Sequence, residues 1–161
     1  MCVIAFAWHA HPRWRLVLIG NRDEFHARPS LPLARWDQPA IVAGKDLEAG
    51  GTWLGVTDDG RCSVVTNVRD PRDPQLGRSR GLLSLDYLAG NEDAVTHAET
   101  LLRSAADYRP FNLLTFDATH AFYIGNRPDA RAQLVEAGVH GLSNADFNTP
   151  WPKTRALMGH L

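Results

Sequence analysis

Several features that mark specialised protein classes are scarce in this chain of 161 residues. It has only two cysteines, Cys2 and Cys62, which are too few to build a disulfide framework. It has no apolar run of the roughly 18 residues that a membrane span requires. Its apolar start has neither the basic leader nor the small-residue cleavage site of a secretory signal. These absences predict a cytoplasmic protein.

A surplus of charge is also missing. The 17 basic and 18 acidic residues give a net charge of −1 with neutral histidines. Nucleic acids and anionic membrane surfaces attract a basic surplus, so neither is an expected partner. The length and a hydrophobic fraction of 44% fit one globular domain over residues 1–161. We expect its partner to be a small-molecule ligand or substrate.

The order of the secondary-structure signals predicts an α+β domain. Runs of β-branched and aromatic residues around short turns indicate hairpins, whereas apolar residues at helical spacing indicate helices. Strands first, helices next and strands again favour helices packed on antiparallel sheet. We expect strands at 3–8, 14–19, 52–56, 62–67, 111–116, 121–124, 132–134 and 139–143, and helices at 79–88, 92–104 and from 152 to the end.

The segments between these elements carry predictions of their own. The proline-containing stretch 21–39 is expected to be a long polar connection, and 68–80 a loop. Ser79 and Asn91 are suitable helix N-caps, and Gly90 is a suitable C-terminal stop. Pro152 suits the first position of the last helix, because its missing N–H costs nothing there.

Cys2 is the strongest candidate for chemistry. Removal of the initiator methionine before a small residue would give Cys2 a free α-amine beside its thiol. Ordinary pKa values, about 8.5 for the thiol and about 7.7–8.0 for the amine, lie within about a unit of each other. The amine can therefore take the thiol proton, and no histidine is required. Alternatively, position 2 only holds a small apolar residue.

A charged segment, Asn21-Arg22-Asp23-Glu24, follows the second expected strand. In a hairpin, the end of the second strand lies beside the start of the first, which places Arg22 and Asp23 near Cys2. An arginine there favours the thiolate, and an aspartate there can hold the protonated amine. The alternative is a capped turn with surface ion pairs.

Two asparagines, Asn67 and Asn144, each follow an expected strand. Side-chain amides are neutral donors that can stabilise an oxyanion, although asparagine is also a common turn residue. Trp53 and Trp151 lie in aromatic segments that could line an apolar pocket. For Trp53, core packing is the preferred interpretation.

The histidines and the second thiol indicate less. His9 and His11 have a spacing that places both rings on one side of a strand, but no third ligand stands at a recognisable spacing. We therefore expect hairpin-tip histidines and no metal site. Cys62, inside an apolar strand, is expected to be an inert buried thiol.

A series of motifs then stands in order along the chain: Met1-Cys2, Gly20-Asn21-Arg22-Asp23-Glu24-Phe25 with Arg28-Pro29, Gly50-Gly51-Thr52-Trp53-Leu54-Gly55, Thr66-Asn67-Val68-Arg69, Gly141-Leu142-Ser143-Asn144 and Thr149-Pro150-Trp151-Pro152-Lys153. Together these motifs resemble the NRDE family, which is the family of transport and Golgi organisation protein 2. The match spans the chain, and the combination is highly specific. Members of the family are longer, so we expect this domain to lack its C-terminal part.

The resemblance implies the fold of N-terminal nucleophile hydrolases, a four-layer αββα sandwich of antiparallel sheets flanked by helices. The NRDE family is similar to the choloylglycine hydrolase and penicillin V acylase branch of these enzymes, which cleaves amide bonds with an N-terminal cysteine. This implies an amidohydrolase-like protein that cleaves a non-peptide C–N bond through a Cys2 acyl-enzyme, with no cofactor. Family members have also been linked to haem trafficking and to lipid or acyl-CoA metabolism. The alternative is therefore a haem- or acyl-CoA-binding carrier without hydrolysis, in which Cys2, His9 or His11 could be axial haem ligands.

The resemblance also implies roles for single positions. Cys2 matches the nucleophile, Arg22 and Asp23 match the charged residues beside it, and Asn67 and Asn144 match the asparagines of the site.

Further expectations concern the surroundings of these residues. Glu24 could replace Asp23, because the two segments match only with a one-residue slip. Glu24, Arg69 and Trp151 are expected to contact the substrate. One more arginine of that branch lies beyond residue 161.

Overall fold

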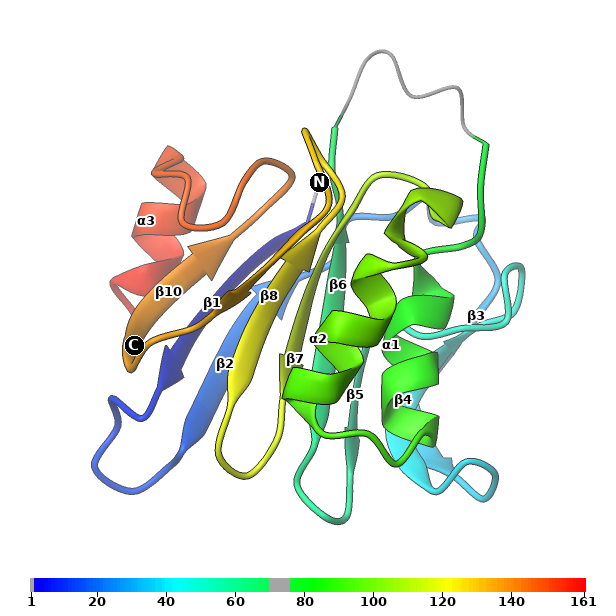
Figure 1. Ribbon diagram of the computed structural model, residues 1–161, viewed down its shortest axis with the longest axis horizontal. Helices are drawn as coiled ribbons and strands as arrows, with labels where there is room; N and C mark the ends of the chain where they lie inside the picture. The colour runs from blue at the N-terminus through cyan, green and yellow to red at the C-terminus, as the bar shows by residue number, and fades with distance from the viewer. Residues whose placement is uncertain (1, 70–75) are drawn as a thin grey trace.

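Two antiparallel sheets form the centre of the protein (Figure 1). The computed structural model describes residues 2–69 and 76–161. The smaller sheet has the strand order β10-β1-β2, and the larger has the order β3-β4-β5-β6-β7-β8-β9. The strands are β1 (Val3–Trp8), β2 (Leu16–Asn21), β3 (Ser30–Trp36), β4 (Ile41–Asp46), β5 (Leu54–Thr57), β6 (Cys62–Asn67), β7 (Phe111–Phe116), β8 (Ala121–Gly125), β9 (Arg131–Leu134) and β10 (Gly138–Leu142), and the helices are α1 (Gly81–Ala89), α2 (Ala94–Leu102) and α3 (Pro152–Met158), with a 3₁₀ turn at Ala105–Asp107.

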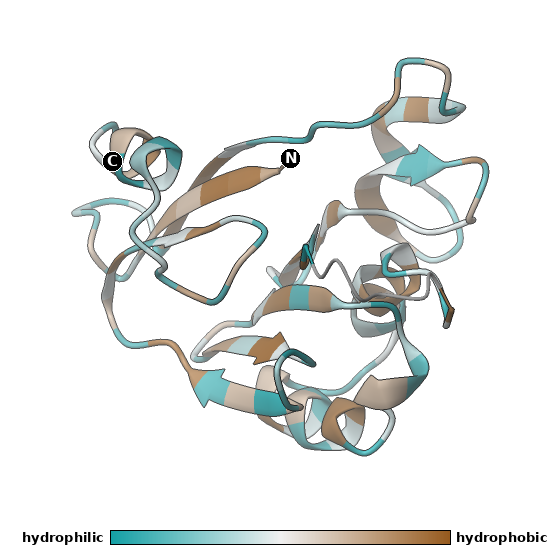
Figure 2. Ribbon diagram, turned by 90° about the horizontal axis from the view of Figure 1, so that it is seen from above, coloured by the Kyte–Doolittle hydropathy of each residue, from teal (hydrophilic) through white to brown (hydrophobic). Residues whose placement is uncertain are grey.

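The two sheets pack face to face, with helices on both outer sides. Alternation along β1 sends Ile4 and Phe6 toward the larger sheet, where they join Val64 and Leu114 in one buried cluster. Val65 points the other way from β6 and packs beneath α1 and α2. Helix α3 contacts β1 and β10 on the outer side of the smaller sheet. The layers therefore run α3, smaller sheet, larger sheet, and α1 with α2, as the view from above in Figure 2 also shows.

The predicted α+β class, with antiparallel sheets and helices on their outer faces, is confirmed. The described residues contain all eight predicted strands and all three predicted helices, with ends shifted by a few residues. The predicted hairpins pair as expected, β1 with β2, β5 with β6, and β7 with β8. The assignment to the N-terminal nucleophile hydrolase fold goes further than this layer order and stays a prediction.

The prediction of a polar connection over 21–39 was wrong for its second half, where β3 lies. This strand is at the edge of the larger sheet, and most of its residues are exposed, so it has no apolar run. Pro32 is tolerated because an edge strand leaves one side without ladder partners, and the pairing shifts register between Leu31 and Ala34. Strand β4 was not predicted either. Of the predicted loop 68–80, positions 70–75 lie outside the described residues.

The two predicted N-caps were also wrong. Helix α1 begins after Arg80, without a capping hydrogen bond from any described side chain. Helix α2 is capped by Asp93, whose carboxylate accepts the Thr96 N–H at 2.7 Å. Asn91 lies too far upstream to reach those first amides. Gly90 and Pro152 do stand at the helix ends where they were expected.

One glycine of the Gly-Gly-Thr motif fixes the start of α1. A Cβ atom on Gly51 would lie 2.3 Å from the carbonyl carbon of Gly81, which is closer than any side chain can approach. The next residue, Thr52, donates its N–H to the Gly81 carbonyl at 3.1 Å. The motif therefore holds the beginning of α1 against the loop before β5, at the wall of the cavity described next.

Candidate functional site

The start of β1 meets the ends of β6 and β10 at one edge of the two sheets. Thr66 Oγ1 donates to the Ser143 carbonyl oxygen at 2.7 Å, and Ser143 Oγ donates to the Cys2 carbonyl oxygen at 2.7 Å. Lys153 Nζ, from α3, lies 3.4 Å from the same Cys2 oxygen. The main chain of Cys2 is therefore held from two elements, and the residue is only 9% exposed.

A cavity of about 630 Å³ opens beside Cys2. This volume is within the range of sites for small organic ligands. Its lining combines many charges with an apolar part. The charged residues are Arg22, Asp23, Glu24, Arg28, Lys45, Asp46, Glu48, Arg80 and Arg109, and the apolar ones include Phe25, Leu31, Leu33, Trp53, Leu54 and Val65.

Arg22 and Asp23 line this cavity together with Cys2. They are brought there by the pairing of β1 with β2, in which Val3 lies opposite Asn21. Gly20 allows the close approach, because a Cβ there would lie 2.8 Å from the Val3 carbonyl oxygen. The positive charges of the amino terminus and of Lys153 lower the pKa of the Asp23 carboxyl.

Asn67 ends β6 of the larger sheet and Asn144 follows β10 of the smaller sheet, and the two meet in space. Asn67, the last residue of β6, lines the cavity. Asn144 Nδ2 donates to the Asn67 carbonyl oxygen at 2.8 Å, and its Oδ1 accepts the Ser143 hydroxyl at 3.2 Å. Asn144 is buried behind Asn67 and is not among the described residues of the cavity wall.

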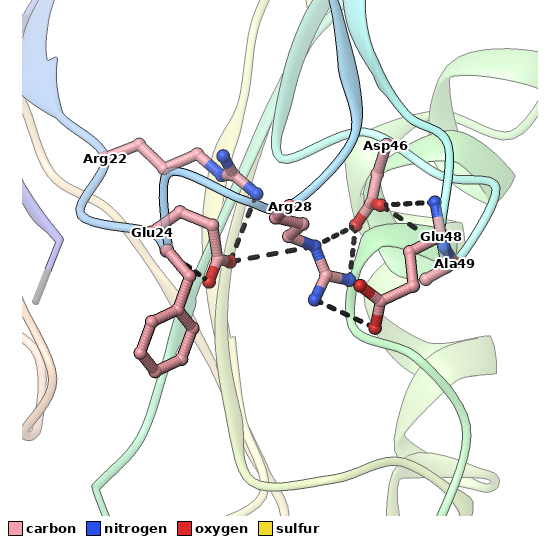
Figure 3. A network of polar contacts seen from close by, with 7 residues as sticks. Arg22, Glu24, Arg28, Asp46, Glu48 and Ala49 are labelled. Atoms are coloured by element: carbon pink, nitrogen blue, oxygen red, sulfur yellow. Dashed lines mark hydrogen bonds and ion pairs between the residues drawn. The ribbon is translucent and has the colours of Figure 1, made fainter.

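Glu24 belongs to a series of ion pairs along one wall of the cavity (Figure 3). Its Oε2 lies 3.2 Å from an Arg22 amino group and 3.8 Å from Arg28 Nε. Arg28 also pairs with Asp46 at 2.7 Å and with Glu48 at 3.3 Å. Burial acts against ionisation of Asp46, but its hydrogen bonds to Arg28 and to two main-chain amides prevail and lower its pKa.

The other two expected substrate contacts lie elsewhere. Arg69 donates its main-chain N–H to the Asn144 carbonyl at 3.0 Å, and Trp151 caps the start of α3, where Lys153 Nζ lies 5.5 Å from its ring centre. Neither is among the described residues that line the cavity. Trp53 does line it, and it also packs against both large core clusters.

Several residues of the site were missed by the sequence reasoning: Arg28 lines the cavity, whereas Ser143 and Lys153 contact the Cys2 carbonyl oxygen. Arg28, Ser143 and Lys153 stand inside the motifs that carried the family resemblance, but their residue types alone did not point to a role. Arg80 and Arg109 stand in no motif. They reach the cavity from the start of α1 and the loop before β7, a proximity that local spacing does not encode.

Cys62 and the histidines are not among the described residues that line the cavity. Burial raises the pKa of the Cys62 thiol to about 12, which fits the expected inert core residue. His9 and His11 lie at the exposed tip of the first hairpin, where His11 Nδ1 accepts the N–H groups of Arg13 and Trp14. Within 2–69 and 76–161, no three His, Cys, Asp or Glu side chains are grouped as metal ligands.

The arrangement defines an α+β protein of two packed sheets, with a thiol at the wall of a charged cavity where strand ends meet. Such a cavity can position a nucleophilic thiolate or bind an amphipathic molecule. Residues 1–161 match the family described as Transport and Golgi organisation 2, and the chain belongs to this family. The family resemblance found from the motifs is confirmed.

Curated relatives give the same assignment. The chain is 34% identical to the mouse Transport and Golgi organization 2 homolog and to the human Transport and Golgi organization protein 2 homolog, over 166 residues in each case. These matches cover 95% of this chain and 60% of each relative. The Drosophila melanogaster Transport and Golgi organization protein 2 is 28% identical over 174 residues, which cover 96% of this chain and 62% of that protein. The chain thus spans about 60% of the length of these relatives. No helix among the described residues is long and apolar enough to cross a membrane.

Proposed function

We propose that this protein is an N-terminal-cysteine amidohydrolase that cleaves a non-peptide C–N bond through an acyl-enzyme on Cys2. The observation that supports this most is the cavity wall, which Cys2 shares with Arg22, Asp23 and Asn67. These residues supply a nucleophile, two charges that can tune it, and a neutral hydrogen-bond donor. We also propose a cytoplasmic location, because a reducing compartment would keep the thiol free.

The first half-reaction requires the removal of Met1, which gives Cys2 a free α-amine. The amine takes the thiol proton, and the sulfur then bonds to the carbonyl carbon while the π electrons of the C=O bond move to oxygen. Asp23 holds the resulting ammonium, and Arg22 favours the thiolate before the attack. The side-chain amide of Asn67 donates to the oxyanion. Asn144 is buried behind Asn67 and donates to its carbonyl oxygen, so we assign it to positioning Asn67 for this contact.

Collapse of the tetrahedral intermediate completes the first half-reaction, and hydrolysis of the acyl-enzyme then restores the enzyme. When the C=O bond re-forms, the C–N bond breaks, and the leaving amine takes the proton of the ammonium. Water then gives a proton to the α-amine, and its oxygen attacks the thioester carbon. The C–S bond breaks, the carboxylic acid leaves, and the thiol regains its proton. The reaction consumes only the amide and water.

Intact-mass measurement of the purified, untagged protein, before and after treatment with p-nitrophenyl butyrate, tests this proposal. We expect the mass of a chain without Met1 and, in samples quenched with acid within seconds, before the thioester is hydrolysed, one added butyryl group. Cys2→Ala should fold and lose the added group. Cys62→Ala is the matched control and should acylate like the wild type, because Cys62 is buried and its thiol has a pKa of about 12.

Three results would contradict the proposal. The first is a wild-type protein that retains Met1, because the base would then be part of a peptide bond. The second is a wild-type protein that takes up no acyl group. The third is an adduct that persists in Cys2→Ala.

A carrier of haem, a lipid or an acyl-CoA is the second candidate, and one observation favours it. Phe25, Leu31 and Leu33 line the cavity, and they are 84%, 51% and 69% exposed. Exposed apolar side chains beside a cavity are typical of a site for an apolar ligand. Titration of haem into the wild type and Cys2→Ala should give an absorbance change in both if the protein is a haem carrier, because binding should survive the loss of the thiol. No change in either would exclude haem as the ligand.

A further inference from the structure

The cavity has a basic wall that the proposed reaction does not use. Arg80 and Arg109 form this wall. The carbonyl oxygen of Pro110 accepts Arg80 Nε at 2.7 Å and the Val68 N–H at 3.2 Å, which places the wall next to Asn67 at the end of β6.

Arg109 has an unsatisfied donor at this wall. Its Nε is buried and has no hydrogen-bond partner among the described residues. A guanidinium stays charged at any ordinary pH, and a buried N–H without a partner is unfavourable. Arg109 also lines the cavity, where an anion could pair with its charge, because a carboxylate or phosphate matches the guanidinium fork.

Two further arginines of the cavity lining, Arg22 and Arg28, have anionic partners. Arg22 pairs with Glu24, and Arg28 pairs with Asp46 and Glu48. A ligand anion would therefore compete with protein carboxylates at those positions, whereas Arg109 Nε has no hydrogen-bond partner among the described residues.

The start of α1 adds to the positive potential of the basic wall. Ser79 and Gly81, on either side of Arg80, also line the cavity. The first turn of α1 has no acidic residue and, within the described residues, no capping side chain. The amino end of a helix favours negative charge, so its dipole acts in the same direction as the two guanidinium groups.

We propose that the basic wall binds an anionic group, a carboxylate or a phosphate, of the ligand whose amide reaches Cys2. The substrates would then be amides that carry a negative charge away from the scissile bond. The part of this inference that concerns the amide rests on the proposed function. The part that concerns the anion rests on the basic wall of Arg80 and Arg109 and does not depend on any reaction at Cys2.

Fluorescence titration tests the anion site without any reaction at Cys2. The probes are N-dansyl-11-aminoundecanoic acid, its methyl ester and the corresponding phosphonate. We expect the wild type to bind at least one of the two anions about tenfold more tightly than the neutral ester, as one charge-assisted contact would give. Arg109→Gln should reduce this ratio to about twofold, and Arg109→Lys, which keeps the charge, should retain a larger part of it. The stronger of the two anions identifies the group.

The matched control is Arg103→Gln, which removes an exposed arginine that follows α2 and does not line the cavity. It should bind like the wild type, and thermal unfolding of each variant verifies the fold. Wild-type protein that binds all three probes equally, or none of them, overturns the inference. An equal loss in Arg103→Gln does so too, because it would show a general effect of net charge.

Acylation of Cys2 separates this inference from the proposed function. Preference for the anions without acylation of Cys2 would reject the hydrolase and keep the anion site. Acylation of Cys2 without preference for the anions would keep the hydrolase and reject the anion site.

Discussion

Burial determines the protonation of His97, a residue of α2 whose ring contacts Tyr87 of α1. Its Nδ1 is 3.3 Å from Glu92 Oε2, and its ring centre is 4.9 Å from that of Tyr87. Burial lowers the pKa of the imidazole, although Glu92 acts in the opposite direction. Its Nε2 has no hydrogen-bond partner among the described residues. His97 is therefore kept neutral in the folded protein.

This neutrality predicts a loss of stability in mild acid. In the unfolded chain, His97 takes up a proton at a pKa of about 6.5, whereas the folded protein takes it up at lower pH. Protonation therefore favours unfolding as the pH falls below about 6.5. Above that pH, His97 does not contribute to the pH dependence of stability. We expect the melting temperature of His97→Gln to fall less between pH 7.5 and pH 5.5 than that of the wild type.

The control for this measurement is His26→Gln, which changes an exposed imidazole. Its melting temperature should fall with pH as the wild type's does. An equal fall in His97→Gln and the wild type would show that His97 does not titrate with folding.

Single residues of the site were predictable where the chain supplied a local geometric argument. Arg22 and Asp23 could be placed near Cys2 because a hairpin joins the two segments. Arg28, Arg80 and Arg109 reach the cavity from separate elements, so no spacing in the sequence connects them. Asn144 could be singled out by its position after a strand, but its contact with the Asn67 carbonyl depends on how the two sheets pack.

The position of α3 depends on a close contact with β10. A Cβ atom on Gly141 would lie 2.1 Å from Thr154 Cγ2 and 2.9 Å from Met158 Sδ. Thr154 and Met158 belong to the helix that also carries Lys153, which donates to the Cys2 carbonyl. The glycine thus allows α3 to lie close enough to the smaller sheet to reach the site.

Gly141→Ala should therefore destabilise the protein by forcing α3 away from the sheet. We expect a loss of about 1–3 kcal/mol in the free energy of unfolding, measured by urea denaturation. Gly159→Ala, at the exposed end of the same helix, should change it by less than about 0.5 kcal/mol, because its nearest neighbour would be an ordinary 3.4 Å away. Equal effects of the two substitutions would show that the close contact does not determine the position of α3.

Elements were predictable when their own residues carried a pattern. Strand β7 is buried throughout, between the smaller sheet and the helices, and its nearly continuous apolar run reflects this. Strand β3 has little buried surface and contains Pro32, so neither periodicity nor propensity indicated it. Strand β3 forms because it pairs with β4, and such pairing depends on both segments and cannot be recognised in one of them.

On the scale of the whole molecule, the two sheets differ greatly in width. The smaller sheet has three strands and the larger has seven, and β3 is at an outer edge of the larger one. Nearly all of β3 is exposed, whereas every residue of β7 is buried at the centre. Stability should therefore be unevenly distributed across the larger sheet.

Hydrogen–deuterium exchange should reveal this gradient. Peptides that cover β3 should exchange through local opening, well before those that cover β7, which should exchange only on global unfolding. A ligand in the cavity should slow exchange in β3, because Leu31 and Leu33 line it. Equal protection of β3 and β7 in the free protein would contradict the expected gradient.

The order of strands and helices was sufficient to predict the α+β class. It did not show that β10 pairs with β1, because Leu142 and Ile4 lie opposite each other from nearly the two ends of the chain. It also did not show that Thr66 and Ser143 join the two sheets beside Cys2. Long-range pairing of this kind follows from the packing of the whole chain.

The hydrogen bonds that fix position 2 have a consequence for how the family can diverge. Ser143 and Lys153 both donate to the main-chain carbonyl of Cys2. The scaffold thus recognises a peptide group, which every residue type possesses. A descendant with serine or alanine at this position could keep both bonds and the same architecture. The scaffold and the thiol can therefore be inherited separately. Membership of the family does not by itself imply that a protein has a reactive group at this position.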